Sequence, residues 1–150
     1  EKIVINTAFY SNFKLINEVA STYGSQSVVI SLDVNNSWLS KGFTTTHSGT
    51  KKTKRTIDEV IEMINKSNAG EVLLNDISRD GTFEGFNLSL IQRVSSQLSL
   101  PLIANCGGRN LTDIRHALEA GASAVAGGSM FVFRNQNPNS ILINYPSNIY

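Results

Sequence analysis

An apolar strand runs into a polar turn in Leu73-Leu74-Asn75-Asp76-Ile77-Ser78-Arg79-Asp80-Gly81-Thr82, and this stretch decides the fold of the chain. Two further apolar runs end in the same way, Leu102–Gly108 and Ala124–Ser129. Buried parallel strands read as apolar runs, and α/β proteins place their chemistry at the carboxyl ends of such strands. Glycines there let backbone N–H groups approach an anion. Three such ends in succession therefore predict a ligand that carries phosphate.

Predicted strands and helices alternate along the chain. Apolar runs predict five strands: Lys2–Thr7, Ser27–Val34, Glu71–Ile77, Pro101–Cys106 and the beginning of Ala124–Phe133. Apolar residues spaced three and four apart predict four helices: Phe13–Tyr23, Thr56–Ser67, Leu88–Leu98 and Asn110–Ala120. Repeated strand–helix units form parallel sheets with right-handed crossovers, so residues 1–150 are expected to fold as one α/β domain.

A long insertion, Asn35–Lys54, follows the second strand and shows little apolar periodicity. Long loops at the carboxyl end of a strand often carry function. For Trp38 and Phe43 in this insertion, anchoring the loop to its own body is favoured over covering a ligand. A basic cluster closes the segment: Lys51, Lys52, Lys54 and Arg55. Such clusters are usually solvated, and above an active site they could steer a phosphorylated substrate.

The composition is that of an ordinary globular domain. Of the 150 residues, 41% are apolar and 17% are charged, which suffices for a real core. A net charge of +1 predicts binding neither to nucleic acid nor to an anionic membrane surface. The longest apolar runs have strand length and a strand follows Glu1-Lys2 directly, so we expect neither a membrane span nor a signal peptide. The single cysteine, Cys106, fits a reducing cytoplasm and is expected to be inert packing.

Two acids at strand ends are candidates for proton transfer. Asp33 follows the mostly apolar run Val28–Leu32, and Asp80 stands in the turn that ends the strand quoted above. Each could start a turn or act as a general acid or base. His47 and His116 stand far apart without ligand spacing to another His or Cys, so we expect no metal site and no cofactor.

Polar and glycine-bearing strand ends are candidates for phosphate binding. Asn6 and Thr7 follow the first strand and carry groups that donate to phosphate oxygens, although the pair also suits a turn. Gly107-Gly108 and Gly127-Gly128-Ser129 end two successive strands. Barrel enzymes often hold a phosphate at their last two strand ends, and tight turns are the alternative.

The sequence resembles the cyclase subunit of imidazole glycerol phosphate synthase. Five segments carry the resemblance: Lys2–Ala8, Gly24–Asp33, Ala69–Leu74, Arg79–Thr82 and Ser129–Phe133. That family is a (βα)₈ barrel, and this sequence resembles it only from the fourth strand onward. The expected fold is therefore the five-stranded, parallel C-terminal part of a TIM barrel, without the first three βα units.

The resemblance implies an activity and a role for each candidate residue. The cyclase takes ammonia from a glutaminase partner and converts phosphoribulosyl-formimino carboxamide ribotide into imidazole glycerol phosphate and aminoimidazole carboxamide ribotide, in histidine biosynthesis. Asp33 matches the catalytic aspartate of the fifth strand, and Asn6 and Thr7 match residues that hold one substrate phosphate. The site for the other phosphate matches Asp80, Gly81, Gly107, Gly128 and Ser129. Lys2 and Glu71 match charged residues at the opposite mouth, where ammonia enters.

The sequence also departs from the family at several points. The family's second catalytic aspartate belongs to its first strand, which has no counterpart here. Asn75 stands where Thr or Ser is usual, Ser78 where Asp is usual, and Asn105-Cys106 replaces a smaller pair such as Ser-Gly. The ending Ile141–Pro146 resembles a paralogous branch from surface-polysaccharide gene clusters, which supplies ammonia for amidino-sugar formation.

Two other classes of function stay open. The neighbouring ribotide isomerase of histidine biosynthesis shares the barrel and a segment like Asp76–Thr82, whereas Asn6-Thr7 and Ser129–Phe133 favour the cyclase. A partial barrel can also be catalytically inactive, since it lacks the first-strand acid. Five strands cannot close a barrel, so the first and last strands would expose their edges and we expect the chain to self-associate.

Overall fold

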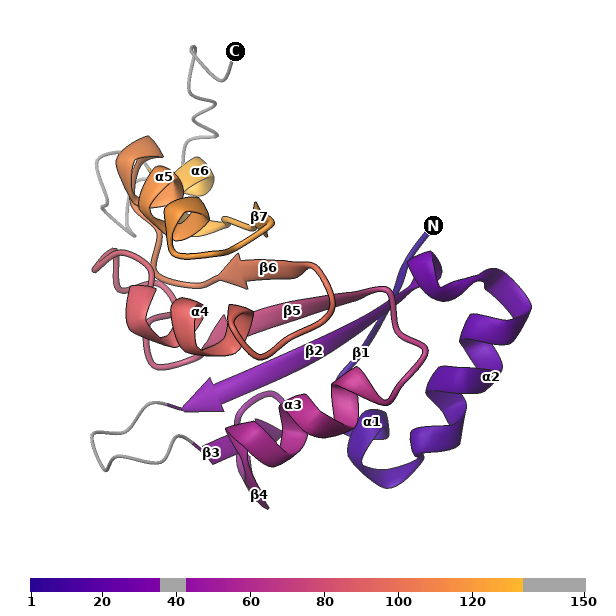
Figure 1. Cartoon of the computed structure of the whole chain (residues 1–150). Coiled ribbons are helices and arrows are strands. Elements are labelled where there is room, and N and C mark those ends of the chain that lie inside the picture. Colours follow the sequence, from indigo (N-terminus) through magenta and orange to yellow (C-terminus); the bar gives the residue numbers. More distant parts are fainter. Residues whose placement is uncertain (36–42, 134–150) are drawn as a thin grey trace.

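Five parallel strands in chain order form the sheet of the computed structural model, which describes residues 1–35 and 43–133 (Figure 1). They are β1 (Ile3–Ile5), β2 (Val28–Asn35), β5 (Glu71–Asp76), β6 (Leu102–Asn105) and β7 (Ala124–Val125). Each pairs in parallel with the next: β1 with β2, β2 with β5, β5 with β6, and β6 with β7. The predicted sequential parallel sheet is confirmed. Trp38 and the segment Ile141–Pro146 lie outside the described residues.

An antiparallel hairpin, β3 (Phe43–Thr46) and β4 (Lys51–Thr56), extends the sheet beyond β2. The expectation of an insertion without strands is therefore wrong for this part of the chain. Hydroxyl groups rather than apolar alternation hold the hairpin. The Oγ1 atoms of Thr44 and Thr53 lie 2.6 Å apart, and Thr45 Oγ1 donates to the backbone oxygen of Asp33 at 3.4 Å. Polar strands of this kind leave no apolar period in the sequence.

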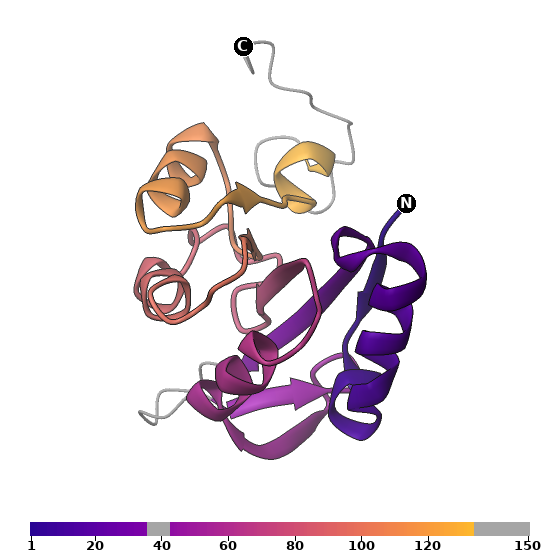
Figure 2. The same cartoon turned by 45° about the vertical axis from the view of Figure 1, so that its right-hand side comes forward.

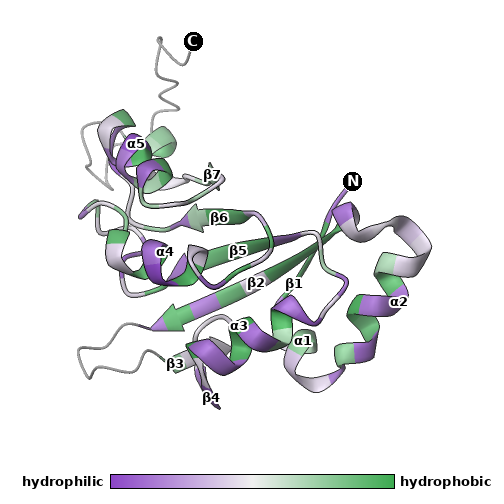
Figure 3. Cartoon of the chain, in the orientation of Figure 1, coloured by the Kyte–Doolittle hydropathy of each residue, from purple (hydrophilic) through white to green (hydrophobic). Residues whose placement is uncertain are grey.

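Amphipathic helices cover one face of the sheet. They are α2 (Phe13–Tyr23), α3 (Ile57–Asn65), α4 (Leu88–Ser95) and α5 (Leu111–Glu119). Helix α3 begins with a capping box, since Glu59 Oε2 accepts from Thr56 N at 2.7 Å and Thr56 Oγ1 accepts from Glu59 N at 3.3 Å. Asn87 and Asn110 cap α4 and α5 with their side-chain oxygens. Figure 3 shows both hydrophobic and hydrophilic residues on these helices and mostly hydrophobic residues on β2.

Three shorter elements correct the predicted boundaries. Thr7 does not end the first strand but begins the short helix α1 (Thr7–Ser11), and a 3₁₀ turn η1 (Ser25–Ser27) precedes β2. The last predicted strand keeps only Ala124 and Val125, and α6 (Ser129–Val132) begins after three intervening residues. Strands this short are defined by pairing with a neighbour, which a sequence pattern does not reveal.

The two faces of the sheet differ in burial. Along β5, Val72, Leu74 and Asp76 are buried beneath the helices, whereas Glu71, Leu73 and Asn75 are half-buried on the other face. Strand β1 pairs only with β2, and its Ile3 and Val4 side chains are 45% and 57% exposed. The described strands β1 and β7 lie at opposite ends of the parallel set and do not pair, so the sheet stays open (Figure 2). Within the described residues, no helix is long and apolar enough to cross a membrane.

Candidate active site

Two adjoining cavities lie at the carboxyl ends of the parallel strands. The first, here called the carboxylate cavity, has a volume of about 490 Å³ and includes Asn6, Thr7 and Asp33 in its lining. The second, the glycine cavity, measures about 170 Å³ and is lined in part by Gly81, Gly107, Gly128 and Ser129. Both share Asp80, Asn105 and Cys106. All the residues predicted at the carboxyl ends thus come together at one edge of the sheet.

A row of side chains from three strands holds the Asp33 carboxylate. Asp33 is 7% exposed, and its Oδ1 accepts from Asn75 Nδ2 at 2.7 Å and from Ser31 Oγ at 3.3 Å. Asn105 Nδ2 in turn donates to Asn75 Oδ1 at 2.8 Å. The register places Asp33 beside Asn75 and Asn75 beside Asn105. No described residue hydrogen-bonds to Asp33 Oδ2, so this oxygen is available to a reactant.

Sequence reasoning missed the supporting role of this row. In the sequence, Asn75 and Asn105 differ from the family pattern, and Ser31 lies within a mostly apolar predicted strand. The available signal was their shared position, since each stands at or near the carboxyl end of a predicted strand. Only the register shows that their amides form one chain toward Asp33.

Asn6 and Thr7 line the carboxylate cavity from the end of β1. Asn6 Nδ2 donates to the backbone oxygen of Ser31 at 2.9 Å, and Thr7 Oγ1 donates to Asn6 Oδ1 at 3.2 Å. Thr7 Oγ1 also accepts from the backbone N–H of His47 at 3.0 Å. His47, which the sequence leaves isolated, therefore reaches the cavity through the turn of the β3–β4 hairpin.

The glycines of the second cavity serve different purposes. A Cβ on Gly81 or Gly128 would meet no other atom within 4 Å, so their backbones lie open to the cavity. A Cβ on Gly107 would lie 2.5 Å from the backbone oxygen of Gly85, and the φ of Gly107 is +91°. Gly107 is therefore required by the loop contact itself, whatever the cavity binds.

Cys106 lines both cavities rather than packing in the core, which corrects the expected placement. Its φ of 76° lies in the left-handed region, where a residue with a side chain is strained. Burial, followed by the negative charge of Asp80, raises the pKa of the Cys106 thiol to about 12. The thiol is therefore protonated at neutral pH, so it is no nucleophile.

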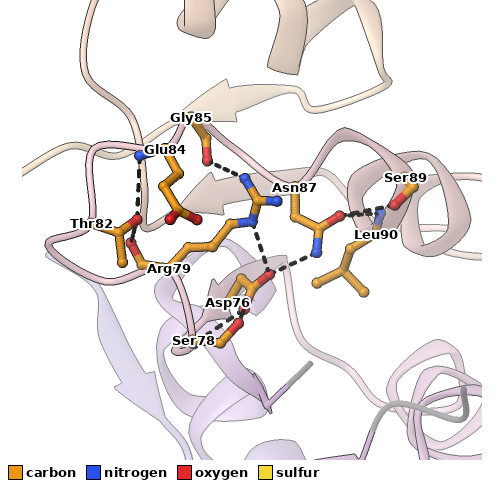
Figure 4. A network of polar contacts seen from close by, with 9 residues as sticks. All are labelled: Asp76, Ser78, Arg79, Thr82, Glu84, Gly85, Asn87, Ser89 and Leu90. Carbon is orange, nitrogen blue, oxygen red and sulfur yellow. Dashed lines mark hydrogen bonds and ion pairs between the residues drawn. The ribbon is translucent and has the colours of Figure 1, made fainter. Parts of the chain in front are cut away.

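A buried acid organises the loop that carries Asp80 and Gly81 (Figure 4). Asp76 is 3% exposed; its Oδ1 accepts from the hydroxyl and the N–H of Ser78, and its Oδ2 accepts from Asn87 Nδ2 at 2.7 Å. Arg79 Nε lies 3.9 Å from Asp76 Oδ2, and Arg79 Nη1 donates to the backbone oxygen of Gly85 at 2.9 Å. This network ties β5 to the loop and to the cap of α4. It fixes the segment between the two cavities.

Lys2 and Glu71 meet at the opposite edge of the sheet. Lys2 directly precedes β1 and Glu71 begins β5, and the two side chains form an ion pair. Glu71 Oε2 is buried and has no hydrogen-bond partner among the described residues. The structure thus joins the two charged residues that the resemblance assigns to the ammonia entrance.

The fold and these cavities define a class, that of (βα)-barrel proteins with a polar site at the carboxyl ends of parallel strands. The family model described as "Histidine biosynthesis protein" matches residues 1–137. The chain belongs to this histidine biosynthesis family, and its resemblance to the cyclase subunit of imidazole glycerol phosphate synthase is confirmed at this level.

Several curated proteins are similar to nearly the whole chain. A "Putative imidazole glycerol phosphate synthase subunit HisF" of Leptospira borgpetersenii is 36% identical over 149 residues, which cover 98% of this chain and 58% of that protein. A "Putative imidazole glycerol phosphate synthase subunit hisF2" of Pseudomonas aeruginosa is 38% identical, with coverages of 97% and 58%. The imidazole glycerol phosphate synthase subunit HisF of Thermobifida fusca is 39% identical, with coverages of 89% and 54%. The chain therefore spans little more than half the length of these relatives.

Proposed function

We propose that this chain forms the C-terminal part of the cyclase subunit of imidazole glycerol phosphate synthase, a lyase of histidine biosynthesis. The single observation that carries the proposal is the pair of adjoining cavities at the strand ends. One holds a buried carboxylate and the other is lined by open glycine backbone. Phosphoribulosyl-formimino carboxamide ribotide has a phosphate at each end and its reacting centre between them, which suits this layout.

Asp33 is the proposed general acid or base. The amide of Asn75 fixes its Oδ1 at 2.7 Å, and Oδ2 is left to exchange a proton with the substrate. Asn6 and Thr7 are proposed to hold one substrate phosphate next to this carboxylate.

Backbone N–H groups are proposed to hold the second phosphate in the glycine cavity, around Gly81, Gly107, Gly128 and Ser129. Asp80 also lines this cavity. Because a carboxylate repels a phosphate, we assign Asp80 to a neighbouring hydroxyl group of the substrate rather than to the phosphate itself. Its place between the two cavities agrees with this role.

The ion pair of Lys2 and Glu71 is proposed as the gate for ammonia, with a glutaminase subunit docked on that edge of the sheet. The amino ends of the strands face the partner in this arrangement, and the carboxyl ends face the substrate. A cytoplasmic location belongs to the same proposal, since the free thiol of Cys106 suits a reducing compartment.

This chain alone is proposed to be inactive, because the second family aspartate has no counterpart in it. The same reasoning predicts self-association through the open edges of β1 and β7. Sedimentation at micromolar concentration tests this, and we expect a dimer that Val4→Lys weakens by placing a charge on the exposed edge strand. A stable, well-folded monomer of the unaltered chain would refute self-association.

The amidino-sugar branch is a second candidate, favoured by one observation. Three of the four departing residues named above, Asn75, Asn105 and Cys106, line the carboxylate cavity, which is the proposed reaction centre. One assay separates the candidates: the full-length parent is given ammonia and the carboxamide ribotide, and imidazole glycerol phosphate is measured. Formation of this product supports the cyclase, whereas its absence with a folded parent supports the second branch. Turnover of the isomerase substrate instead would contradict both.

A further inference from the structure

A third cavity, of about 600 Å³, lies between helix α1 and strand β4, and we call it the hairpin pocket. Thr7, Tyr10 and Ser11 of α1 line one side, and Lys51–Arg55 of β4 line the other. Figure 1 shows α1 and the hairpin close together at the same end of the sheet. The lining of this strongly basic pocket therefore contains five hydroxyl-bearing side chains: Thr7, Tyr10, Ser11, Thr46 and Thr53.

The charge of the hairpin pocket is unbalanced. The four basic residues of β4 stand within five consecutive positions, in a chain whose net charge is only +1. Five other basic residues form ion pairs: Lys2, Lys66, Arg79, Arg93 and Arg109. None of the four on β4 forms an ion pair within residues 1–35 and 43–133. Glu59, the acid that lines the pocket, is occupied at the cap of α3 by Thr56 N at 2.7 Å.

The hairpin pocket also adjoins the carboxylate cavity. Thr7 and His47 line both, and the hydrogen bond from His47 N to Thr7 Oγ1, 3.0 Å long, joins their common wall. An anion attracted to β4 therefore arrives at the same threonine that lines the site beside Asp33. Clefts lined by one sign of charge raise the local concentration of oppositely charged ligands.

We propose that the hairpin pocket is a binding site for a phosphate group, which captures a phosphorylated ligand before that group moves to Asn6 and Thr7. Lys54 and Arg55 supply the countercharge and the N–H donors. The final transfer to Thr7 rests on the proposed function. Capture of the anion does not, because it depends only on the pocket.

Lysines on an edge strand have another use, since they prevent edge-to-edge pairing. That use requires charge of either sign, whereas anion capture requires positive charge. A charge reversal separates the two. The double variant Lys54→Glu/Arg55→Glu keeps the edge strand charged but reverses the charge at two positions of the hairpin pocket. The matched control Lys14→Glu/Arg115→Glu makes the same change in charge at exposed positions outside the three cavities.

The test is a titration of the 150-residue chain and of both double variants with inorganic pyrophosphate, monitored by the NMR signals of the backbone amides. In the unaltered chain, we expect the largest changes in amide chemical shift at residues 51–56, Thr7 and His47. We expect Lys54→Glu/Arg55→Glu to lose at least about tenfold in affinity and the matched control at most about twofold. Sedimentation checks that both variants keep the oligomeric state of the unaltered chain.

The proposal is overturned if pyrophosphate does not shift the amide signals of residues 51–56 in the unaltered chain. An equal loss of affinity in both variants would also overturn it. The amides of Gly107, Gly128 and Ser129 are followed in the same spectra. Their response reports on the glycine cavity separately. Failure of the hairpin pocket and failure of the proposed substrate site are therefore distinguishable.

Discussion

The two cavities at the strand ends differ in whether backbone or side chains set their geometry. The glycine cavity is mainly backbone, and its shape comes from loop conformations such as the φ of +70° at Gly81 and +91° at Gly107. The carboxylate cavity is mainly side chain, and its geometry comes from the row of Asp33, Asn75 and Asn105. A backbone site tolerates changes in its neighbours but not an added Cβ. A side-chain site keeps its shape under isosteric changes but loses its chemistry.

The largest expected effect is a loss of turnover when the carboxylate cavity is altered. Asp33→Asn keeps the shape of the carboxylate and removes the group that accepts a proton, so turnover of the complete enzyme falls by about 10²–10⁴. Asp58→Asn is the matched control, since Asp58 is exposed, lies outside both cavities, and among the described residues forms a surface ion pair with Arg93 and a hydrogen bond with Gln97. Steady-state turnover with ammonia measures the difference. Near-normal turnover in Asp33→Asn rules out acid–base catalysis by this residue.

The next largest expected effect is a loss of phosphate affinity when a glycine of the glycine cavity is replaced. At Gly128 the φ is −115°, outside the left-handed region that favours glycine, and the space around its Cβ is open. We expect Gly128→Val to fold normally and to weaken phosphate affinity by about tenfold, because a branched side chain blocks one or two backbone hydrogen bonds. Calorimetry with inorganic phosphate measures the affinity. Gly107→Val, by contrast, should also lower the free energy of unfolding by about 1–3 kcal/mol. Unchanged affinity in both variants contradicts a phosphate site there.

A smaller effect, on the free energy of unfolding, is expected at the loop between the two cavities. Asp76→Asn turns an acceptor of Asn87 Nδ2 into a donor that faces it and removes the ion pair with Arg79. We expect the free energy of unfolding to fall by about 1–3 kcal/mol, measured by urea denaturation. Asp58→Asn again serves as the control with at most about 0.5 kcal/mol. Equal losses in the two variants would show that the Asp76 network does not stabilise the loop.

The smallest effect concerns the thiol that both cavities share. Since burial raises the pKa of Cys106 to about 12, the folded chain keeps the thiol protonated over a range in which the unfolded chain ionises. This contribution to stability is present below the unfolded pKa and is lost as pH rises from about 9 to about 12. Alkylation at pH 8 should be at least about tenfold slower in the folded chain than in urea. Equal rates would show that the thiol is ionised as readily as in solvent.

Local pattern determined most of the architecture. Apolar runs and amphipathic spacing predict the five parallel strands and the helices α2 to α5, because β2, β5, β6 and these helices bury their apolar residues in one core. The capping residues Thr56, Asn87 and Asn110 could be read directly, since a cap acts within three or four residues. The residues at the carboxyl ends of strands could be grouped for the same reason, because parallel strands bring those ends to one edge of the sheet.

Contacts between distant segments decided the rest. The β3–β4 hairpin is held by threonine hydroxyls and lacks an apolar period, so its pairing with β2 is visible only in the structure. The same hairpin brings His47 to Thr7 across 40 positions of the chain. The amide row that fixes Asp33 depends on the register of three strands, and a shift by one residue would turn each side chain to the other face. Local residue patterns thus specify the elements and the edge of the sheet that carries the site, whereas the pairing of distant segments sets which side chains meet there.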